Sequence, residues 1–190
     1  DSIVIEVCCT FCYSFTEFFV ISSEVKKRYF LMAVNIGLGA EAIMISDECK
    51  HYWGKRNPTY IISIFRLFLH RKLYKMHLKV NDEVINERLM TVCVGNSRGY
   101  GLTPSAVPYN GWLDVSVVYR PEFWQLVQGL WMLLRGQILN HKQVKPYRTK
   151  KVVLHSAEGA SICVDGRTLE YACPLEISLM PEYLNFIVPD

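Results

Sequence analysis

The stretch ICVDGRTLEYACPLEIS, residues 162–178, places an Asp-Gly pair between two runs of strand-forming residues. A two-residue Asp-Gly turn between such runs is a strong signal for a β-hairpin, because both turn positions need a positive φ that Asp and Gly tolerate. The stretch therefore predicts two antiparallel strands joined at Asp165 and Gly166. It leaves open whether Asp165 only shapes the turn or also takes part in chemistry.

Other runs of β-branched and aromatic residues predict strands along the rest of the chain. They cover residues 2–11, 17–21, 29–35, 73–80, 87–94, 115–119, 144–155, 160–164, 174–179 and 184–188. Helices are expected over residues 40–52, 59–69 and 121–136. Because strands outnumber helices and follow one another in hairpin-like runs, we expect an α+β domain that is mainly β, an antiparallel two-sheet β-sandwich with two or three attached helices.

The composition favours a single folded domain. The 190 residues are 51% hydrophobic, which suffices for a large core and argues against global disorder. The net charge of +3 is too small to indicate nucleic-acid binding. The odd number of cysteines, seven, and the lack of a secretory leader favour a reducing cytoplasm. Cys9 and Cys12 would point to opposite faces of a strand, and no histidine pair has HExxH spacing, so a zinc site is not expected.

Two of the expected helices carry apolar segments, residues 60–69 and 123–134, that are apolar on nearly every side. Both are shorter than the roughly 20 apolar residues needed to cross a bilayer. Two interpretations stay open: the helices are buried on two sides, or part of each lines an apolar cleft for an acyl chain or touches a membrane surface. Basic residues follow both helices, which suits an anionic lipid surface but is also common on a solvated face.

Four segments, in this order and spacing, resemble a known family. They are RYFLMAVNIGLGAEA at 28–42, VCVGNSRGYGLTPSAVPYNGWLDVSVV at 92–118, ICVDGRTLE at 162–170 and PEYLNFIVP at 181–189. Together they look like the C-terminal domain of the diacylglycerol kinase and sphingosine kinase-like lipid kinases, most of all the bacterial branch.

The resemblance implies a two-domain enzyme that transfers the γ-phosphate of ATP to a lipid hydroxyl, such as that of diacylglycerol, with ATP and magnesium as cofactors. In the family an N-terminal domain with a Gly-Gly-Asp-Gly-Thr motif holds the nucleotide, and a C-terminal β-sandwich faces the lipid. This chain contains no Gly-Gly-Asp-Gly stretch. Residues 1–190 are therefore expected to be the second domain, and the start at Asp1 suggests that the chain is a fragment.

The resemblance also implies partners and a location. The expected partners are the lipid substrate, the protein's own N-terminal nucleotide-binding domain, a transient membrane surface and, as an option, a second copy of the chain. The expected location is cytoplasmic and peripheral at the membrane. A catalytically inactive lipid-binding or regulatory module of the same fold is the alternative function. A generic β-sandwich with an accidental match is a third.

Residue by residue, the family pattern assigns roles along the chain. It implies substrate binding by Gly37, Glu41 and Asn96, a structural loop at Gly99, Gly101 and Pro104, and a metal site at Asn110 and Asp114. Asn110 stands where many relatives have Asp, so it offers magnesium an oxygen without a charge. Without the family, Glu41 is an acid in a first helical turn and Asp114 is a cap at the start of a strand.

The turn at residues 165–167 matches a catalytic position of the family, which usually reads Asp-Gly-Glu. Asp165 and Arg167 are therefore the candidate catalytic residues. An Arg can neither accept a hydroxyl proton nor bind magnesium, but it can clamp phosphate oxygens. Three interpretations stay open: Glu170 or an acid of the other domain replaces the missing Glu, the protein is a weak or inactive homologue, or Arg167 binds phosphate in a modified mechanism.

Overall fold

The computed structural model describes residues 15–23, 27–53, 72–98, 102–108, 110–170 and 173–185. The strand expected at 2–11 and the helix expected at 59–69 lie outside these ranges. So do Gly99 and Gly101 of the expected structural loop.

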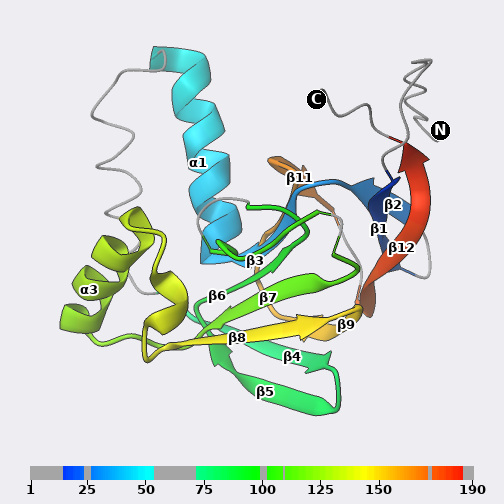
Figure 1. Ribbon diagram of the computed structural model, residues 1–190. Helices are drawn as coiled ribbons and strands as arrows, with labels where there is room; N and C mark the ends of the chain where they lie inside the picture. The colour runs from blue at the N-terminus through cyan, green and yellow to red at the C-terminus, as the bar shows by residue number, and fades with distance from the viewer. Residues whose placement is uncertain are drawn as a thin grey trace.

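The described strands form two six-stranded sheets in which all pairs are antiparallel (Figure 1). Sheet A has the order β2-β1-β12-β9-β4-β5, with β1 Phe15–Ser23, β2 Lys27–Phe30, β4 Tyr74–Val80, β5 Glu83–Leu89, β9 Lys151–Ala157 and β12 Leu175–Asn185. Sheet B has the order β11-β10-β3-β6-β7-β8, with β3 Ala33–Gly37, β6 Thr91–Gly95, β7 Leu113–Val118, β8 Val144–Thr149, β10 Ile162–Val164 and β11 Arg167–Leu169. The described part also holds α1 Leu38–Trp53, α3 Phe123–Leu134 and the short 3-10 helix η1 Ile138–Asn140. The predicted fold class is confirmed.

The hydrophobic core lies between the two sheets. Strand β4 alternates between buried and more exposed side chains, as a strand with one solvated face should, and it contributes Met76, Leu78 and Val80 to the core. Strands β3, β6 and β7 are buried along their whole length. The second face of β3 and β6 is covered by α1, and the Leu102 segment lies against β7, where the Ser116 hydroxyl donates to the Leu102 carbonyl at 2.6 Å. Cover on both faces explains why these strands read as continuous apolar runs.

Three segments that read as single strands are each two strands in different sheets. The chain passes from sheet A to sheet B at Leu31 and Met32, between β2 and β3, and again at Met90, between β5 and β6. It returns from sheet B to sheet A at Lys150, between β8 and β9. The predictions of one strand over 29–35, 87–94 and 144–155 are therefore wrong, because a corner between two packed sheets can keep its apolar side chains inside on both arms.

Each corner is fixed by hydrogen bonds to the backbone. The N–H of Met90 donates to the carbonyl of Val118 at 2.9 Å, and its carbonyl accepts the N–H of Leu38 at 3.0 Å. At the third corner the hydroxyl of Thr149 accepts the N–H of Lys151 at 3.2 Å and donates to its carbonyl at 2.9 Å. The prediction of two separate strands over 174–179 and 184–188 is also wrong. A single strand, β12, runs unbroken over Leu175–Asn185.

The segment after β6 folds back over its own strand at Gly95. A Cβ atom at Gly95 would lie 2.8 Å from Thr103 Cβ and 2.9 Å from Thr103 Cγ2, so a side chain has no space there. Thr103 is completely buried and its hydroxyl donates to the Ser97 carbonyl at 3.2 Å. The glycine therefore lets the loop that carries Pro104 lie directly on sheet B.

We expect Gly95→Ala to lower the free energy of unfolding by about 1–3 kcal/mol, because Thr103 must move to admit the methyl group. Urea denaturation measures this change. Gly129→Ala is the matched control: its Cβ would meet His141 at ordinary distances of 3.6–3.8 Å, and alanine favours a helix. Equal stability of Gly95→Ala and the wild type would contradict the close approach at Thr103.

Candidate functional site

The hairpin at Asp165 is confirmed. Val164 of β10 pairs with Arg167 of β11, and the two residues between them have φ values of 46° and 85°. Both values lie in the left-handed region that a two-residue hairpin turn of this type requires. Asp tolerates this conformation better than most residues, which explains why Asp precedes Gly in the turn.

The Asp165 carboxylate binds the backbone of the first corner. Its Oδ2 accepts the N–H of Leu31 at 2.7 Å, and its Oδ1 accepts the N–H groups of Met32 at 2.9 Å and Ala33 at 3.0 Å. The N–H of Asp165 also donates to the Ala33 carbonyl at 3.0 Å. Both carboxylate oxygens are thus used to hold the chain where it changes sheets.

Asn96 reaches the same corner from the end of β6. Its Nδ2 donates to the Leu31 carbonyl at 2.8 Å, and its backbone N–H donates to the Met32 carbonyl at 2.9 Å. The side chains of Leu31 and Met32 themselves are exposed. The structure therefore brings Asp165 and Asn96, two of the predicted site residues, together on one exposed bend, which we call the Asp165 corner.

Arg167 follows this corner with an exposed side chain. Among the residues that the structure describes, its guanidinium makes no hydrogen bond or ion pair. A guanidinium presents paired N–H donors whose geometry matches phosphate oxygens, so an anion is the class of ligand that it suits.

Gly37 and Glu41 lie at the other end of β3. Gly37 has a φ of 85°, and a Cβ there would lie 2.9 Å from both Met76 Cε and the Met90 carbonyl oxygen, so glycine is required where β3 gives way to α1. Ala33 pairs with Gly95 at one end of β3, and Gly37 pairs with Thr91 at the other. Five residues of strand span about 13 Å, so the Asp165 corner and the Gly37 end are separated by at least this distance.

Glu41 is held by two partners in the structure. Its Oε1 accepts Lys72 Nζ at 2.7 Å and the hydroxyl of Tyr74. Burial first, and then the Glu41 carboxylate, raise the pKa of Tyr74 well above its ordinary value, so the phenol stays protonated and donates. These bonds tie the first turn of α1 to β4, which gives Glu41 a structural role; its predicted substrate contact stays a prediction.

Asn110 and Asp114 do not fit a magnesium ion as they are bonded here. Asp114 Oδ1 accepts Arg148 Nε at 2.8 Å, and its Oδ2 accepts the Ser105 hydroxyl at 2.8 Å. Asn110 Oδ1 accepts the N–H of Trp112 at 2.9 Å. A hard cation needs several free oxygen ligands, whereas here a guanidinium occupies the carboxylate. In the described ranges no three His, Cys, Asp or Glu side chains converge on a metal position.

A small apolar pocket of about 60 Å³, open to solvent, lies between α3, the start of α1 and the ends of β6 and β7. Its wall is formed mainly by carbon atoms of Met90, Leu102, Val118, Leu126, Leu130, Leu133 and Ile138. Gly39 and Thr91 also line it, which places the pocket at the Gly37 end of β3. Residues 123–134 were expected either to be buried on two sides or to line an apolar cleft or touch a membrane. The structure shows that one side of α3 lines an apolar pocket.

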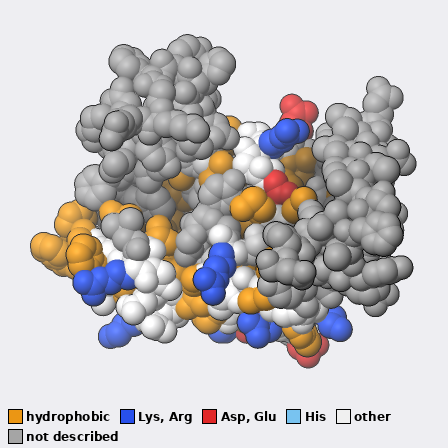
Figure 2. All heavy atoms as spheres, turned by 45° about the horizontal axis from the view of Figure 1, so that its top comes forward, with side chains coloured by type: hydrophobic (Ala, Val, Ile, Leu, Met, Phe, Trp, Pro, Cys, Tyr) orange, Lys and Arg blue, Asp and Glu red, His pale blue; other side chains and the backbone are white. Residues whose placement is uncertain are grey.

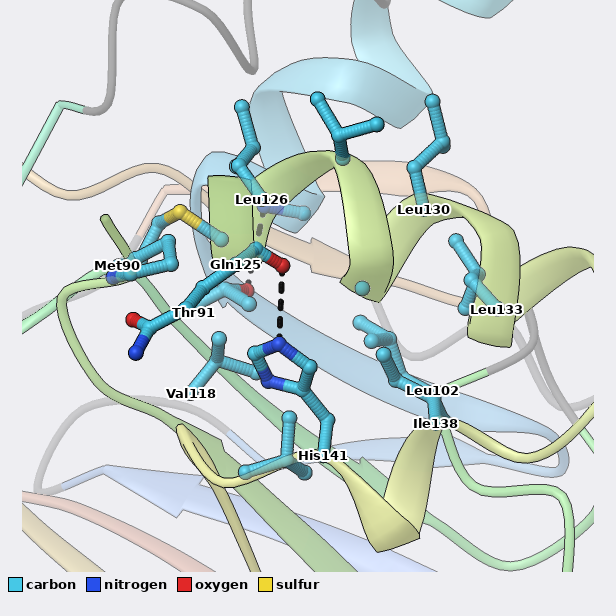
Figure 3. Close-up of a pocket in the computed structure, with 15 residues that line it drawn as sticks. Met90, Thr91, Leu102, Val118, Gln125, Leu126, Leu130, Leu133, Ile138 and His141 are labelled. Carbon is cyan, nitrogen blue, oxygen red and sulfur yellow. Dashed lines mark hydrogen bonds between the residues drawn. The ribbon is translucent and has the colours of Figure 1, made fainter. Parts of the chain in front are cut away.

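His141 fixes α3 over this pocket, as Figure 3 shows. The imidazole is buried; its Nε2 lies 2.9 Å from the Gln125 carbonyl oxygen, and its Nδ1 accepts the N–H of Gln143 at 3.2 Å. This pattern requires the tautomer with the proton on Nε2. The sequence suggested only a basic residue after the helix, whereas the structure gives His141 a place in the pocket wall.

Asn35 was missed at the level of sequence. It lies in the middle of β3 and is buried, and neither polar atom of its side chain has a hydrogen-bond partner among the described residues; the same holds for Asn96 Oδ1. Each unsatisfied buried polar atom costs about 1–3 kcal/mol. The signal was present as a single polar residue in the apolar run Ala33–Gly37, which is unusual for a strand buried on both faces.

The two-sheet topology, with a loop folded back over the central strands, defines a β-sandwich domain. The family model described as the YegS C-terminal NAD kinase β-sandwich-like domain matches residues 32–188. The chain belongs to this family. The resemblance inferred from the four sequence segments is confirmed.

Solved structures agree on the fold. Two proteins from Bacillus anthracis strain Sterne, both provisionally named diacylglycerol kinase, superpose with TM-scores of 0.62 and 0.59 at 16% and 17% identity. The matches cover 89% and 88% of this chain but 55% of each of those chains. This chain therefore spans about half the length of the structures that it matches. No curated protein matches its sequence.

We expect Asp165→Asn to lower the free energy of unfolding by about 1–3 kcal/mol, since an amide offers one acceptor oxygen where the carboxylate offers two. Asn keeps the tolerance for positive φ, so the turn is preserved while the charge and one acceptor oxygen are lost. Hydrogen exchange should accelerate at the amides of residues 31–33. Asp82→Asn, an exposed acid in the turn between β4 and β5, is the control; unchanged exchange in Asp165→Asn would contradict the clamp.

Proposed function

We propose that this chain is the lipid-facing domain of an ATP-dependent lipid kinase that transfers a phosphoryl group to a lipid hydroxyl such as that of diacylglycerol. The observation that carries the proposal is the apolar pocket beside α3, in a chain that belongs to the YegS C-terminal family. The names of the B. anthracis proteins of the same fold point the same way.

The pocket suits an acyl chain. Its lining is almost entirely apolar, which is the chemistry that an acyl chain requires. The polar groups in its wall already have partners: His141 pairs with the Gln125 carbonyl, and the Thr91 hydroxyl donates to the Ile36 carbonyl at 2.9 Å. A ligand without polar groups can therefore fill the pocket without leaving a hydrogen bond unmade.

The phosphoryl end of the reaction is assigned to the Asp165 corner. Arg167 offers a guanidinium with no partner among the described residues, and phosphate oxygens are its best-matched ligands. Phosphoryl transfer depends on positioning and on neutralising charge, which an arginine can do without acting as a base. In this arrangement the Asp165 carboxylate holds the bend and Arg167 contacts the phosphate.

The nucleotide site is assigned to an N-terminal domain in the full reading frame. Any magnesium that accompanies ATP then takes its ligands there or from the nucleotide, since Asn110 and Asp114 are bonded to protein donors. The general base is likewise assigned to an acid outside this turn. The candidates are Glu170, which is exposed and directly follows β11, and a residue of the other domain.

The second candidate is a lipid-binding or regulatory module without kinase activity. The observation that favours it is the Arg at position 167, where the family usually has an acid, together with the occupied carboxylate of Asp114. Under this second candidate function the protein binds a lipid in the pocket but transfers no phosphoryl group.

We expect Arg167→Gln to reduce phosphoryl transfer at least about tenfold, because it removes the charge that contacts the phosphate while keeping a side chain of similar length. The assay supplies labelled ATP, magnesium and diacylglycerol micelles to the full-length protein. Lys79→Gln, an exposed cation on the outer face of β4, is the control. Transfer that appears only in Arg167→Glu would show a disabled kinase scaffold, and no transfer by any variant would favour the lipid-binding module.

Filling the pocket tests the lipid site separately. We expect Leu130→Trp to weaken binding of a long-chain diacylglycerol at least about tenfold, or by about 1.4 kcal/mol, and to leave a short-chain analogue less affected. Fluorescence titration with a labelled lipid measures both. Val84→Trp, the control, places the same side chain on an exposed position of β5, outside both α3 and the pocket wall; equal losses in the two variants would contradict the assignment.

A further inference from the structure

Helix α3 is apolar on two sides, and in the part of the chain that the structure describes only one of them lines the pocket. Leu126, Leu130 and Leu133 line the pocket. The other side exposes four large apolar side chains, with exposed fractions of 47%, 77%, 41% and 57% for Phe123, Trp124, Val127 and Trp131. Spacings of three, four and seven residues place Trp124, Val127 and Trp131 on one face of the helix, which we call the outer face of α3.

The outer face is more apolar than folding requires. An exposed tryptophan gains nothing from the core, and contiguous apolar side chains on a surface mark a site of interaction. The helix start does not need them either, because the capping box at Glu122 and Gln125 is complete, with the Glu122 N–H donating to Gln125 Oε1 at 2.9 Å. Figure 2 shows hydrophobic side chains gathered at this end of the molecule, with basic side chains beside them.

The charges around the outer face are positive. Arg120 precedes the helix, Arg135 and Lys142 follow it, and all three are exposed. Arg135 lies over the Trp131 ring with its Cζ at 4.6 Å from the ring centre. Between residues 120 and 142 the sequence contains one acid, Glu122, which takes part in the helix cap. Tryptophan beside arginine and lysine is the composition that binds the headgroup region of an anionic bilayer.

Val127 connects the outer face to the pocket. It is 41% exposed and also belongs to the pocket wall, so the pocket opens beside the exposed tryptophans. The helix lies in the connection between β7 and β8, at one edge of sheet B, whereas the Asp165 turn joins β10 to β11 at the opposite edge (Figure 1). A nucleotide domain that reaches Arg167 therefore does not need to cover α3.

We propose that the outer face of α3 binds the surface of an anionic phospholipid membrane, with Trp124 and Trp131 in the headgroup region and Arg120, Arg135 and Lys142 at lipid phosphates. This proposal rests on the proposed lipid-kinase function, because it identifies the membrane surface from which such a kinase would take its lipid. In this orientation the mouth of the pocket faces the bilayer, so an acyl chain passes from membrane to pocket along Val127 with little exposure to water.

Vesicle sedimentation of the full-length protein tests the proposal. Wild type should bind vesicles of phosphatidylcholine with phosphatidylglycerol and should bind vesicles of phosphatidylcholine alone less tightly; high salt should reduce the difference. The double variant Trp124→Ser and Trp131→Ser should lose at least about tenfold in partitioning. Trp112→Ser, which removes an exposed tryptophan away from α3, is the matched control and should bind like wild type.

Two readouts separate this proposal from the proposed function. Transfer to a short-chain lipid dissolved as a monomer should be equal in wild type and the double variant, because neither tryptophan lines the pocket. If the double variant binds anionic vesicles like wild type, the proposal that the outer face of α3 binds membranes is overturned. The transfer to a short-chain lipid still tests the proposed kinase function in that case. If the double variant instead turns a dimer into a monomer in sedimentation velocity and wild type ignores vesicles, the outer face is an interface between copies and the proposal is overturned.

Discussion

Three hydrogen bonds from backbone N–H groups to the Asp165 carboxylate hold the rest of the structure in place. They fix the point where the chain leaves sheet A for sheet B, and Asn96 supports the same bend from a different strand. Without this bend β2 and β3 would continue as one strand, and β3 could not take its place between β10 and β6 at the centre of sheet B. The turn at Asp165 and Gly166 thus fixes the arrangement of the two sheets and also carries the candidate phosphate site.

The sequence predicted what depends on local signals. The Asp-Gly hairpin and the class of the fold follow from turn chemistry and composition. Helices predicted over 40–52 and 121–136 are observed as Leu38–Trp53 and Phe123–Leu134, so their existence was predicted and their ends were off by one or two residues. It did not predict the corners at residues 31–32, 90 and 150, because an apolar run looks the same whether it continues in one sheet or passes to the next. What decides the matter is a partner distant in the chain, such as Asp165 for Leu31 or Val118 for Met90.

The same limit applies to the candidate site. Family resemblance pointed to Asp165, Asn96, Gly37 and Glu41, but only the structure shows that they form two groups at opposite ends of β3. It also shows that Asp114 pairs with Arg148, which no spacing in the sequence indicates, since the two residues meet across the β7–β8 pair. For α3, burial on two sides proved wrong: one face lines a pocket and the other is solvated, a distinction that an all-apolar sequence cannot make.

Strand β3 sets the distance between the two groups of candidate site residues. It separates the Asp165 corner, which Arg167 follows, from the end where the pocket begins, and its five residues keep the two at least about 13 Å apart. A strand between two neighbours cannot be lengthened by one residue without turning its buried side chains to the other face. If the chain holds a lipid as proposed, the distance between the site of its phosphoryl acceptor and the start of the pocket can change only in steps of two residues, or about 6.6 Å. Selectivity for chain length in such a domain would change in discrete increments, and finer adjustment would fall to the side chains of the pocket wall.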